Sequence, residues 1–232
     1  MVPGVASRCG DILPAVPLLL LIRHALTETT GKTLAGQAPG IHLSERGREQ
    51  SEGLVERLRP LRLAALYASS SERCVETAEP IARERGLEIR RMPELMDIHY
   101  GDWTGRSLRQ LGRSSRWRSV LANPANGRFP GGESFVEVQA RAVAAVERIT
   151  AAHPRATVAV FTHADPVRLL LTHFGGSHLD AFQRLVVHPT SVSAVLTGDG
   201  ATPRILRVND TGTLADLAPK RRPRSGQRKV GG

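Results

Sequence analysis

Two histidines stand at similar places in this chain, each directly after a short apolar run. His24 and its neighbour Arg23 follow the run 18–22, and His163 follows the run 157–162. A neutral imidazole is a good acceptor for a phosphoryl group near neutral pH, and a second, cationic imidazole can hold the oxygens of the same group. The two histidines therefore indicate phosphoryl transfer through a phosphohistidine.

Two arginines have the side-chain chemistry to bind that phosphoryl group. Its oxygens carry negative charge, so the site needs fixed positive donors. A guanidinium group is planar, stays protonated and binds phosphate oxygens in pairs. Arg23 precedes His24, and Arg73 follows the apolar run 63–68 in a loop that opens a helix. Backbone N–H groups at that helix start can also face an anion.

A phosphomonoesterase also needs a general acid, because the leaving alkoxide has to take up a proton. That acid must be a carboxyl group that stays protonated, or nearly so, at the working pH. No histidine or carboxylate cluster has the spacing of metal ligands, and no glycine-rich loop for ATP or a dinucleotide is present. We therefore expect no metal and no cofactor.

The elements that must position these residues alternate along the chain. Apolar runs predict strands, and runs with a helical period predict helices with caps at Ser44, Ser134 and Asp165. This alternation predicts an α/β layer fold with a largely parallel sheet, which binds ligands at the carboxyl ends of its strands. The expected strands are 18–23, 63–68, 87–91, 157–162, 184–188, 191–197 and 204–208, and the expected helices are 44–59, 72–85, 107–121 (broken), 134–153 and 165–174.

The composition of the 232-residue chain is that of a globular protein, with 41% hydrophobic and 23% charged residues. Its two cysteines do not make a disulfide framework, and the apolar run Leu18–Ile22 is too short to cross a bilayer. We therefore expect no membrane association and a cytoplasmic location. The oligomeric state stays open.

The formal net charge of +10 is concentrated near the end of the chain, where 218–232 holds six lysines and arginines and no acidic residue. We expect this segment to be a basic, disordered tail, and 1–17, with three prolines, to be a flexible extension. The catalytic domain then covers 18–217. Nucleic acid is disfavoured as a partner, because aromatic residues that would stack on bases are not interleaved with the basic ones.

Several short motifs follow one another along the chain. They are Arg23-His24-Ala25, Ser-Ser-Glu-Arg-Cys-Val-Glu-Thr-Ala at 70–78, the loop 94–105 that ends in Gly-Asp-Trp-Thr-Gly, Pro-Gly-Gly-Glu-Ser at 130–134 and Thr-His-Ala-Asp at 162–165. Together they resemble the histidine phosphatase superfamily, also called phosphoglycerate mutase-like, over about 18–217. The runs 100–105 and 206–212 are similar to those of an actinobacterial subgroup whose members are labelled phosphomutases or phosphatases.

The resemblance implies a three-layer α/β/α domain with a largely parallel central sheet, and a small phosphorylated metabolite as substrate. It makes His24 the phosphohistidine and Asp97 the general acid, and it gives His163 both a catalytic and a phosphate-binding role. The other phosphate-binding residues that it implies are Arg23, Arg73 and Thr30, and the implied substrate pocket contains Glu133, Ser134, His99 and Ala164.

The chain departs from the family pattern at four positions. Alanine replaces glycine after each histidine, at Ala25 and Ala164, and adds a methyl group beside the phosphate pocket. Asp97 stands where most relatives have glutamate, so its reach is one methylene shorter. Thr30 stands where asparagine is common. The nearest substitutes for the acid are Glu94, Glu133 and Asp165.

Three functions are compatible with these residues. A phosphatase is favoured over a phosphomutase, because mutases of the family usually carry basic residues around the acid loop, and 97–101 has no arginine. A non-catalytic member, or one recruited to other chemistry in a biosynthetic pathway, would suit the two alanines and the shorter acid. Such a protein has no need of Arg23, His24, Arg73 and His163 together. We therefore predict a metal-independent phosphomonoesterase.

Overall fold

The centre of the computed structural model, which describes residues 16–198 and 201–218, is a six-stranded sheet. Its strand order is β3-β2-β4-β1-β5-β6. Neighbours among β3, β2, β4 and β1 run parallel, whereas β5 is antiparallel to β1 and to β6. The predicted, largely parallel sheet is thus confirmed. The strands are β1 (Leu18–Arg23), β2 (Leu63–Ser69), β3 (Ile89–Met92), β4 (Thr157–Thr162), β5 (Val192–Gly198) and β6 (Ala201–Asp210).

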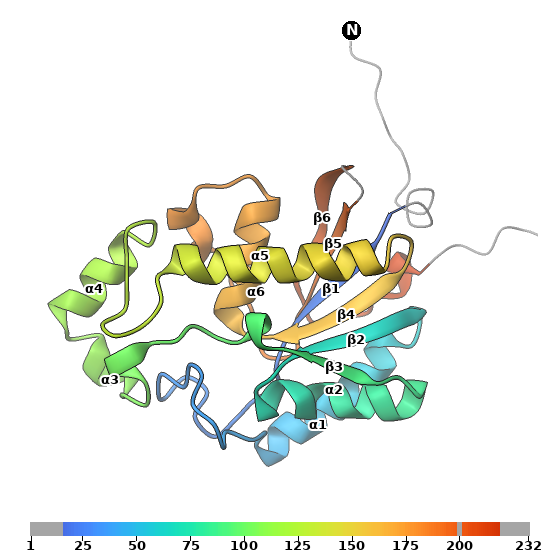
Figure 1. Ribbon diagram of the computed structural model, residues 1–232. Coiled ribbons are helices and arrows are strands. Elements are labelled where there is room, and N and C mark those ends of the chain that lie inside the picture. Colours follow the sequence, from blue (N-terminus) through green and yellow to red (C-terminus); the bar gives the residue numbers. More distant parts are fainter. Residues whose placement is uncertain (1–15, 199–200, 219–232) are drawn as a thin grey trace, which may run out of the picture.

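Helices cover both faces of this sheet (Figure 1). On one face lie α1 (Glu45–Leu58) and α2 (Glu72–Arg85), and on the other lie α5 (Phe135–Ala152) and α6 (Ala164–Phe174). Two shorter helices, α3 (Leu108–Leu111) and α4 (Ser115–Ala122), lie beyond the sheet, near the start of α5. The predicted three-layer α/β/α fold is confirmed, and the helical run 107–121 is broken as expected.

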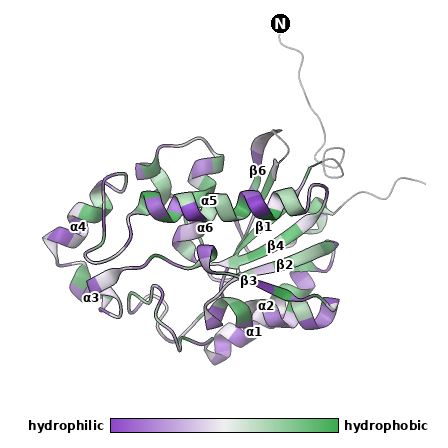
Figure 2. Cartoon of the chain, in the orientation of Figure 1, coloured by the Kyte–Doolittle hydropathy of each residue, from purple (hydrophilic) through white to green (hydrophobic). Residues whose placement is uncertain are grey.

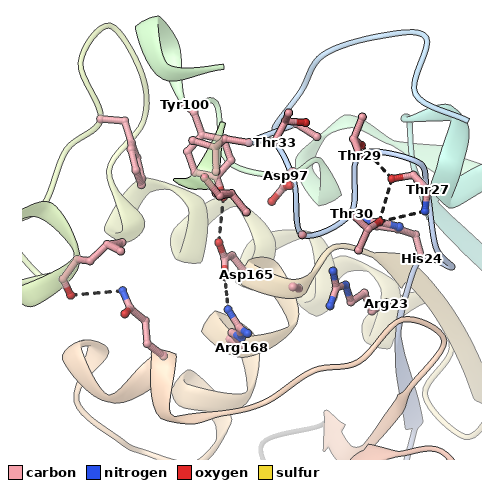
Figure 3. Close-up of a pocket in the computed structure, with 18 of the residues that line it drawn as sticks. Arg23, His24, Thr27, Thr29, Thr30, Thr33, Asp97, Tyr100, Asp165 and Arg168 are labelled. Atoms are coloured by element: carbon pink, nitrogen blue, oxygen red, sulfur yellow. Dashed lines mark hydrogen bonds and ion pairs between the residues drawn. The ribbon is translucent and has the colours of Figure 1, made fainter. Parts of the chain in front are cut away.

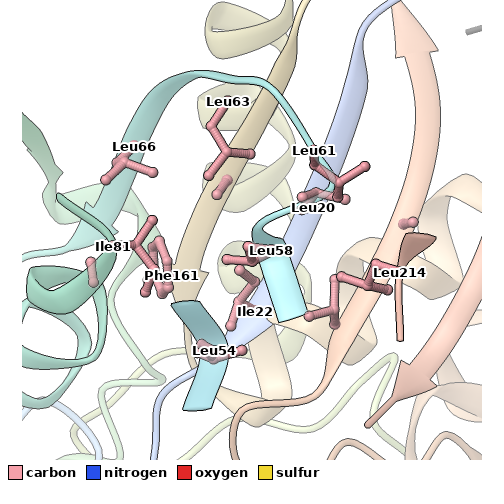
Figure 4. Packing of buried hydrophobic residues seen from close by; sticks show 14 of the residues in the cluster. Leu20, Ile22, Leu54, Leu58, Leu61, Leu63, Leu66, Ile81, Phe161 and Leu214 are labelled. Carbon is pink, nitrogen blue, oxygen red and sulfur yellow. The ribbon is translucent and has the colours of Figure 1, made fainter. Parts of the chain in front are cut away.

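β1 is apolar from Leu18 to Ile22 because both of its faces are buried. Leu20 and Ile22 pack in the layer of α1 and α2 (Figure 4). Leu19 and Leu21 pack in the opposite layer, with α5 and α6. Figure 2 shows the same arrangement, with largely hydrophobic strands between helices of mixed hydropathy. The strand is therefore held rigidly up to its last residue, which places the residue that follows it.

Short polar signals set the ends of the helices. Ser44 and Ser134 cap α1 and α5 as predicted, each accepting a hydrogen bond from the backbone N–H three residues further on. Gly86 ends α2 with a φ of 63°, a left-handed conformation that glycine adopts at little cost.

The predicted start of α6 at an Asp165 cap is wrong by two residues. The helix begins at Ala164, and His163, which is extended, occupies the cap position. The reason is that β4 ends at Thr162, so the chain passes from strand to helix through His163 alone. This histidine is thereby fixed on both sides by regular structure.

The expected strand 184–188 is also wrong. Leu179–Arg184 forms a 3-10 helix, and 185–189 pairs with no strand among the described residues. β5 is already paired on both sides, with β1 and β6, so this apolar run cannot pair with the strand that follows it in the chain. Val187 is buried in spite of this, whereas Val186 is 54% exposed.

The two predicted terminal segments, 1–17 and 218–232, fall almost entirely outside the described residues. Their predicted flexibility and the function of the basic tail stay predictions. In the part of the chain that the structure covers, no helix has the length and hydrophobicity needed to cross a membrane.

Candidate active site

The two histidines meet at the carboxyl edge of the sheet. β1 and β4 are parallel neighbours in which Arg23 is paired with Thr162, so His24 and His163 leave the sheet side by side. The backbone N–H of His24 donates a hydrogen bond to the carbonyl of Thr162, with an N···O distance of 2.9 Å. The two ring centroids are 5.2 Å apart, edge to face. Both side chains are buried, with exposed fractions of 7% and 1%.

His24 has the protonation state of a nucleophile. Its Nδ1 lies 2.7 Å from the carbonyl oxygen of Ala25, a contact that requires the ring proton on Nδ1 and leaves the lone pair on Nε2. Burial lowers the pKa of His24 well below its ordinary value, and the charges of Arg73 and Arg23 lower it further. The ring is therefore neutral at physiological pH.

The two predicted phosphate-binding arginines, of which Arg73 is buried and Arg23 partly buried, have hydrogen-bonding capacity to spare. Nη2 of Arg73 donates to the carbonyl of Gly36 at 2.7 Å, and Nη1 of Arg23 donates to that of Val187 at 2.7 Å. Within the described residues, Nη1 of Arg73 and Nε of Arg23 are buried without a partner. A buried, unpaired donor costs about 1–3 kcal/mol, so such donors are kept where a ligand satisfies them. An anion is the ligand that two guanidinium groups would accept.

His163 is neutral in this structure, contrary to the expectation of a cationic clamp. Its Nδ1 lies 3.1 Å from Nη2 of Arg73, which can only donate, so Nδ1 is the acceptor. Its Nε2 therefore carries the proton, and it faces the hydroxyls of Ser69 at 2.9 Å and Ser71 at 3.3 Å. Burial lowers the pKa of His163 well below its usual value, with Arg73 and His24 adding to the effect. The sequence did not indicate that Arg73 would lie within hydrogen-bonding distance of His163.

Asp97 reaches this cluster despite its shorter side chain. Its Oδ2 lies 3.9 Å from Nη2 of Arg73 and 3.9 Å from Nδ1 of His163. Burial, followed by the negative charge of Asp165, raises the pKa of Asp97 to about 7, against the opposing effect of Arg73. A carboxyl group that is partly protonated near neutral pH can give a proton to a leaving oxygen.

Arg141, on α5, fixes the loop that carries Asp97. It forms a bidentate salt bridge with Glu133, with Nε–Oε1 and Nη2–Oε2 distances of 2.8 and 2.9 Å. It also donates to the carbonyls of Glu94, Met96 and Asp97 at 2.7 to 2.8 Å. Sequence reasoning missed this residue, although an arginine next to the apolar stripe that includes Ala142 is the kind of signal that marks a buried polar contact.

Three of the four predicted pocket residues lie outside the cavity. Glu133 binds Arg141 and the backbone N–H of His99, and Ser134 caps α5. The His99 side chain is exposed. Glu133 and Ser134 hold the loop that carries Asp97 and the start of α5. Their predicted contact with a substrate stays a prediction. Only Ala164 lines the cavity, as predicted.

The cavity itself has a volume of about 400 Å³ and is lined by His24 (Figure 3), whereas His163 is not among its lining residues. Predicted site residues in its lining are Arg23, His24, Thr30, Arg73, Asp97 and Ala164. Ala25 is fully buried behind them, and its backbone N–H donates to the hydroxyl of Thr77 at 3.0 Å. The extra methyl group of Ala25 therefore lies in the core, whereas that of Ala164 borders the cavity.

A second cluster of polar side chains, Tyr100, Asp165 and Arg168, lines the cavity, and the sequence did not predict that they contact one another. The Tyr100 hydroxyl donates to Oδ2 of Asp165 at 3.0 Å, and Nη1 of Arg168 donates to Oδ1 at 2.9 Å (Figure 3). Asp165 is thus fixed beside the cluster, where its charge acts on Asp97. Among the residues that the structure describes, no group of three or more His, Cys, Asp and Glu side chains is arranged to hold a metal ion.

Residues 19–211 match the family model of the histidine phosphatase superfamily, branch 1. The chain belongs to the histidine phosphatase superfamily. The predicted membership is thereby confirmed, and the match spans the two histidines and the acid loop.

Relatives within the superfamily carry both phosphatase and mutase names. Phosphoserine phosphatase 1 of Hydrogenobacter thermophilus is 30% identical over 169 residues, covering 71% of this chain and 79% of that protein. Phosphoglycerate mutase-like protein 4 of Arabidopsis thaliana is 27% identical over 157 residues, covering 66% and 68%. The solved structure of Bacillus stearothermophilus YhfR is 30% identical, covers 84% of this chain and 98% of that chain, and superimposes with a TM-score of 0.78.

Proposed function

We propose that this chain is a phosphomonoesterase that works through a phosphohistidine at His24. The observation that carries the proposal is the convergence of a neutral His24, two guanidinium groups with buried, unpaired donors and a carboxyl group with a pKa of about 7. Superfamily membership and the relatives named as phosphatases support it.

In the first step, Nε2 of His24 attacks phosphorus and the bond from phosphorus to the ester oxygen breaks. The departing oxygen takes the proton of Asp97, so the alcohol leaves neutral. Arg23 and Arg73 hold the equatorial oxygens, and their unpaired N–H groups then gain partners. The negative charge of the phosphoryl group also favours protonation of His163, which then adds a further charged donor.

In the second step, water attacks the phosphohistidine and the bond between phosphorus and Nε2 breaks. The carboxylate of Asp97 accepts a proton from that water, which restores the acid for the next cycle. Phosphate leaves, and His24 is again neutral with its proton on Nδ1. None of these steps routes through a metal ion, so we propose metal-independent hydrolysis of a small phosphorylated metabolite. The predicted cytoplasmic location stays a prediction.

Phosphate release from a panel of phosphomonoesters, in the presence of EDTA, tests the proposal. The wild type should release phosphate and His24→Ala should not. Rapid acid-free quenching followed by mass spectrometry should find one phosphoryl group on His24 of the wild type. Turnover by His24→Ala at the wild-type rate would overturn the proposal.

A phosphomutase is the second candidate, and the mutase-like relative supports it. A mutase returns the phosphoryl group to another hydroxyl, and it needs a second anchor for the substrate. Arg168 is the candidate anchor, because its Nη1 is paired with Asp165 but its Nε is buried without a partner among the described residues. Exchange of phosphate between isomers with little free phosphate would identify a mutase.

A further inference from the structure

One wall of the cavity is apolar and comes from the two short helices beyond the sheet. Leu108 of α3 and Trp117 and Leu121 of α4 line the cavity, and each is only half-buried. Behind them, Phe129 and Phe135 are buried almost completely. The wall therefore has a packed aromatic base and an apolar surface that faces the cavity.

The apolar residues of α4 pack against the aromatic core but keep part of their surface uncovered. None of its residues is fully buried. Trp117 and Leu121 are four residues apart and so share one face of the helix. The Trp117 ring is held by Trp103 and Phe129, with centroid distances of 5.5 and 6.2 Å. A fixed aromatic ring beside a leucine is a typical surface for binding an apolar ligand.

The opposite, threonine-rich wall has little free hydrogen-bonding capacity for a substrate. The Thr27 hydroxyl lies 2.9 Å from the hydroxyls of both Thr29 and Thr30 (Figure 3). The Thr30 hydroxyl also accepts the backbone N–H of Thr27 at 3.0 Å. Two of the three hydroxyl protons are used within this group, which leaves one donor for a substrate.

The cavity offers a second anionic group of the substrate one arginine, Arg168, whose charge an ion pair offsets but whose buried Nε has no partner among the described residues. Its lining in the described chain contains three arginines. Arg23 and Arg73 lie at the phosphate end, and Arg168 is paired with Asp165. Asp165 itself would repel a substrate carboxylate placed nearby. The negative charge of Asp165 and the apolar wall thus both favour an uncharged, apolar leaving group.

We propose that the cavity selects phosphomonoesters of apolar alcohols, with the hydrocarbon part lying along Leu108, Trp117 and Leu121. The proposal rests on the proposed function for the position of the phosphoryl group, which sits on Arg23 and Arg73. A volume of about 400 Å³ leaves room for a leaving group well beyond the phosphoryl group.

Binding of alkylphosphonates tests the proposal without requiring turnover, because their carbon–phosphorus bond is not hydrolysed by this chemistry. The series from methyl- to hexylphosphonate keeps one head group and lengthens only the hydrocarbon part. Isothermal titration calorimetry on the full chain should show the Kd falling about threefold for each methylene that reaches the wall. A chain that ends in a carboxylate should bind at least tenfold more weakly than hexylphosphonate.

Variants of α4 locate the effect. Leu121→Asn keeps the branched shape of the side chain but makes it smaller and polar, and Trp117→Ala removes the ring. Both should flatten the dependence of Kd on chain length and leave methylphosphonate binding within about twofold. Val120→Ala is the matched control, because Val120 is on the same helix but does not line the cavity. Leu121→Asn keeps the test valid if Trp117→Ala fails to fold.

Equal Kd values for methyl- and hexylphosphonate, or the same slope in wild type and Leu121→Asn, would overturn the proposal. Hydrolysis of p-nitrophenyl phosphate, compared between wild type and His24→Ala, is measured in parallel. Turnover that depends on His24 together with a flat binding series would reject the apolar selectivity and leave the proposed function standing. A steep binding series with no turnover of any ester would support the selectivity and reject the hydrolysis.

Discussion

Oδ2 of Asp97 lies 3.9 Å from Nδ1 of His163. The carboxyl group thus borders the phosphate-binding cluster without forming a close ion pair with it. Its separation from Arg73 is also 3.9 Å, so the arginine lowers the pKa of Asp97 too little to offset burial and the charge of Asp165. The result, a pKa of about 7, is what a residue that must both give and take a proton requires.

Asp97→Asn should remove the general acid while keeping the shape of the side chain. Turnover of an alkyl phosphate should fall about 10²- to 10⁴-fold, because an alkoxide leaves poorly without a proton. Turnover of p-nitrophenyl phosphate should fall much less, since nitrophenolate leaves readily without protonation. The ratio of the two losses in kcat checks the role. Equal losses on both esters would show that Asp97 acts on binding and not on the leaving group.

The pH dependence of wild-type turnover follows from the same two residues. His24 has a pKa well below its ordinary value, so it stays unprotonated and nucleophilic into the acid range. Asp97 must be protonated to act as the acid, so kcat/KM for alkyl phosphates should decline as the pH rises through about 7. A pH–rate profile with an alkyl phosphate checks this. A rate that still rises above pH 8 would contradict the assignment.

Asp165→Asn should move that alkaline limb to lower pH. The charge of Asp165 raises the pKa of Asp97, and removing it makes the acid lose its proton sooner. The asparagine can still accept the hydrogen bonds of Tyr100 or Arg168 through its side-chain oxygen. Ionisation of the substrate is the same for both enzymes, so the difference between the two pH–rate profiles reports ionisation of the protein alone. Asp102→Asn, at an exposed position, is the control and should leave the limb in place.

Arg141→Met should loosen the acid loop, because the carbonyls of Met96 and Asp97 lose their shared donor. We expect kcat to fall roughly 10- to 100-fold while KM changes little, since a small displacement of a catalytic group is costly and the phosphate cluster stays intact. The control is Arg148→Met on the same helix, whose partner is the exposed side chain of Glu94. A loss confined to KM would place Arg141 in substrate binding. Arg141→Lys should recover only part of the rate.

The sequence predicted the fold, and the proximity of the two histidines, because both depend on local signals. β1 is apolar along its buried length, and Ser44, Ser134 and Gly86 carry the end signals of three helices. His24 and His163 could be placed at one sheet edge because parallel strands end together.

The remaining features depend on contacts between distant segments, which no local pattern encodes. Arg141 lies 44 residues from Asp97 in the chain but holds its carbonyl. The neutral state of His163 depends on Arg73, which lies 90 positions earlier. Glu133 lies in a motif that the sequence resemblance places in the substrate pocket, and only the structure shows that it is paired with Arg141. Segment 185–189 is apolar enough for a strand, but β6 has already taken the edge of β5.

Thr77→Val should lower the free energy of unfolding more than Thr172→Val does, because Thr77 joins the segment after His24 to the helix that carries Arg73. Its hydroxyl accepts the backbone N–H of Ala25 at 3.0 Å and donates to the carbonyl of Arg73 at 2.6 Å. Valine keeps the shape but leaves a buried N–H unpaired, at a cost of about 1–3 kcal/mol in the free energy of unfolding. The control is Thr172→Val, since the Thr172 hydroxyl is also buried but donates only to a carbonyl of its own helix, that of Arg168. Urea unfolding of both variants measures the difference in the free energy of unfolding. Turnover of Thr77→Val should also fall, because Ala25 follows His24 and its carbonyl fixes the tautomer of the His24 ring. Equal unfolding free energies for the two valine variants would show that the contact between Ala25 and Thr77 does not hold the two segments together.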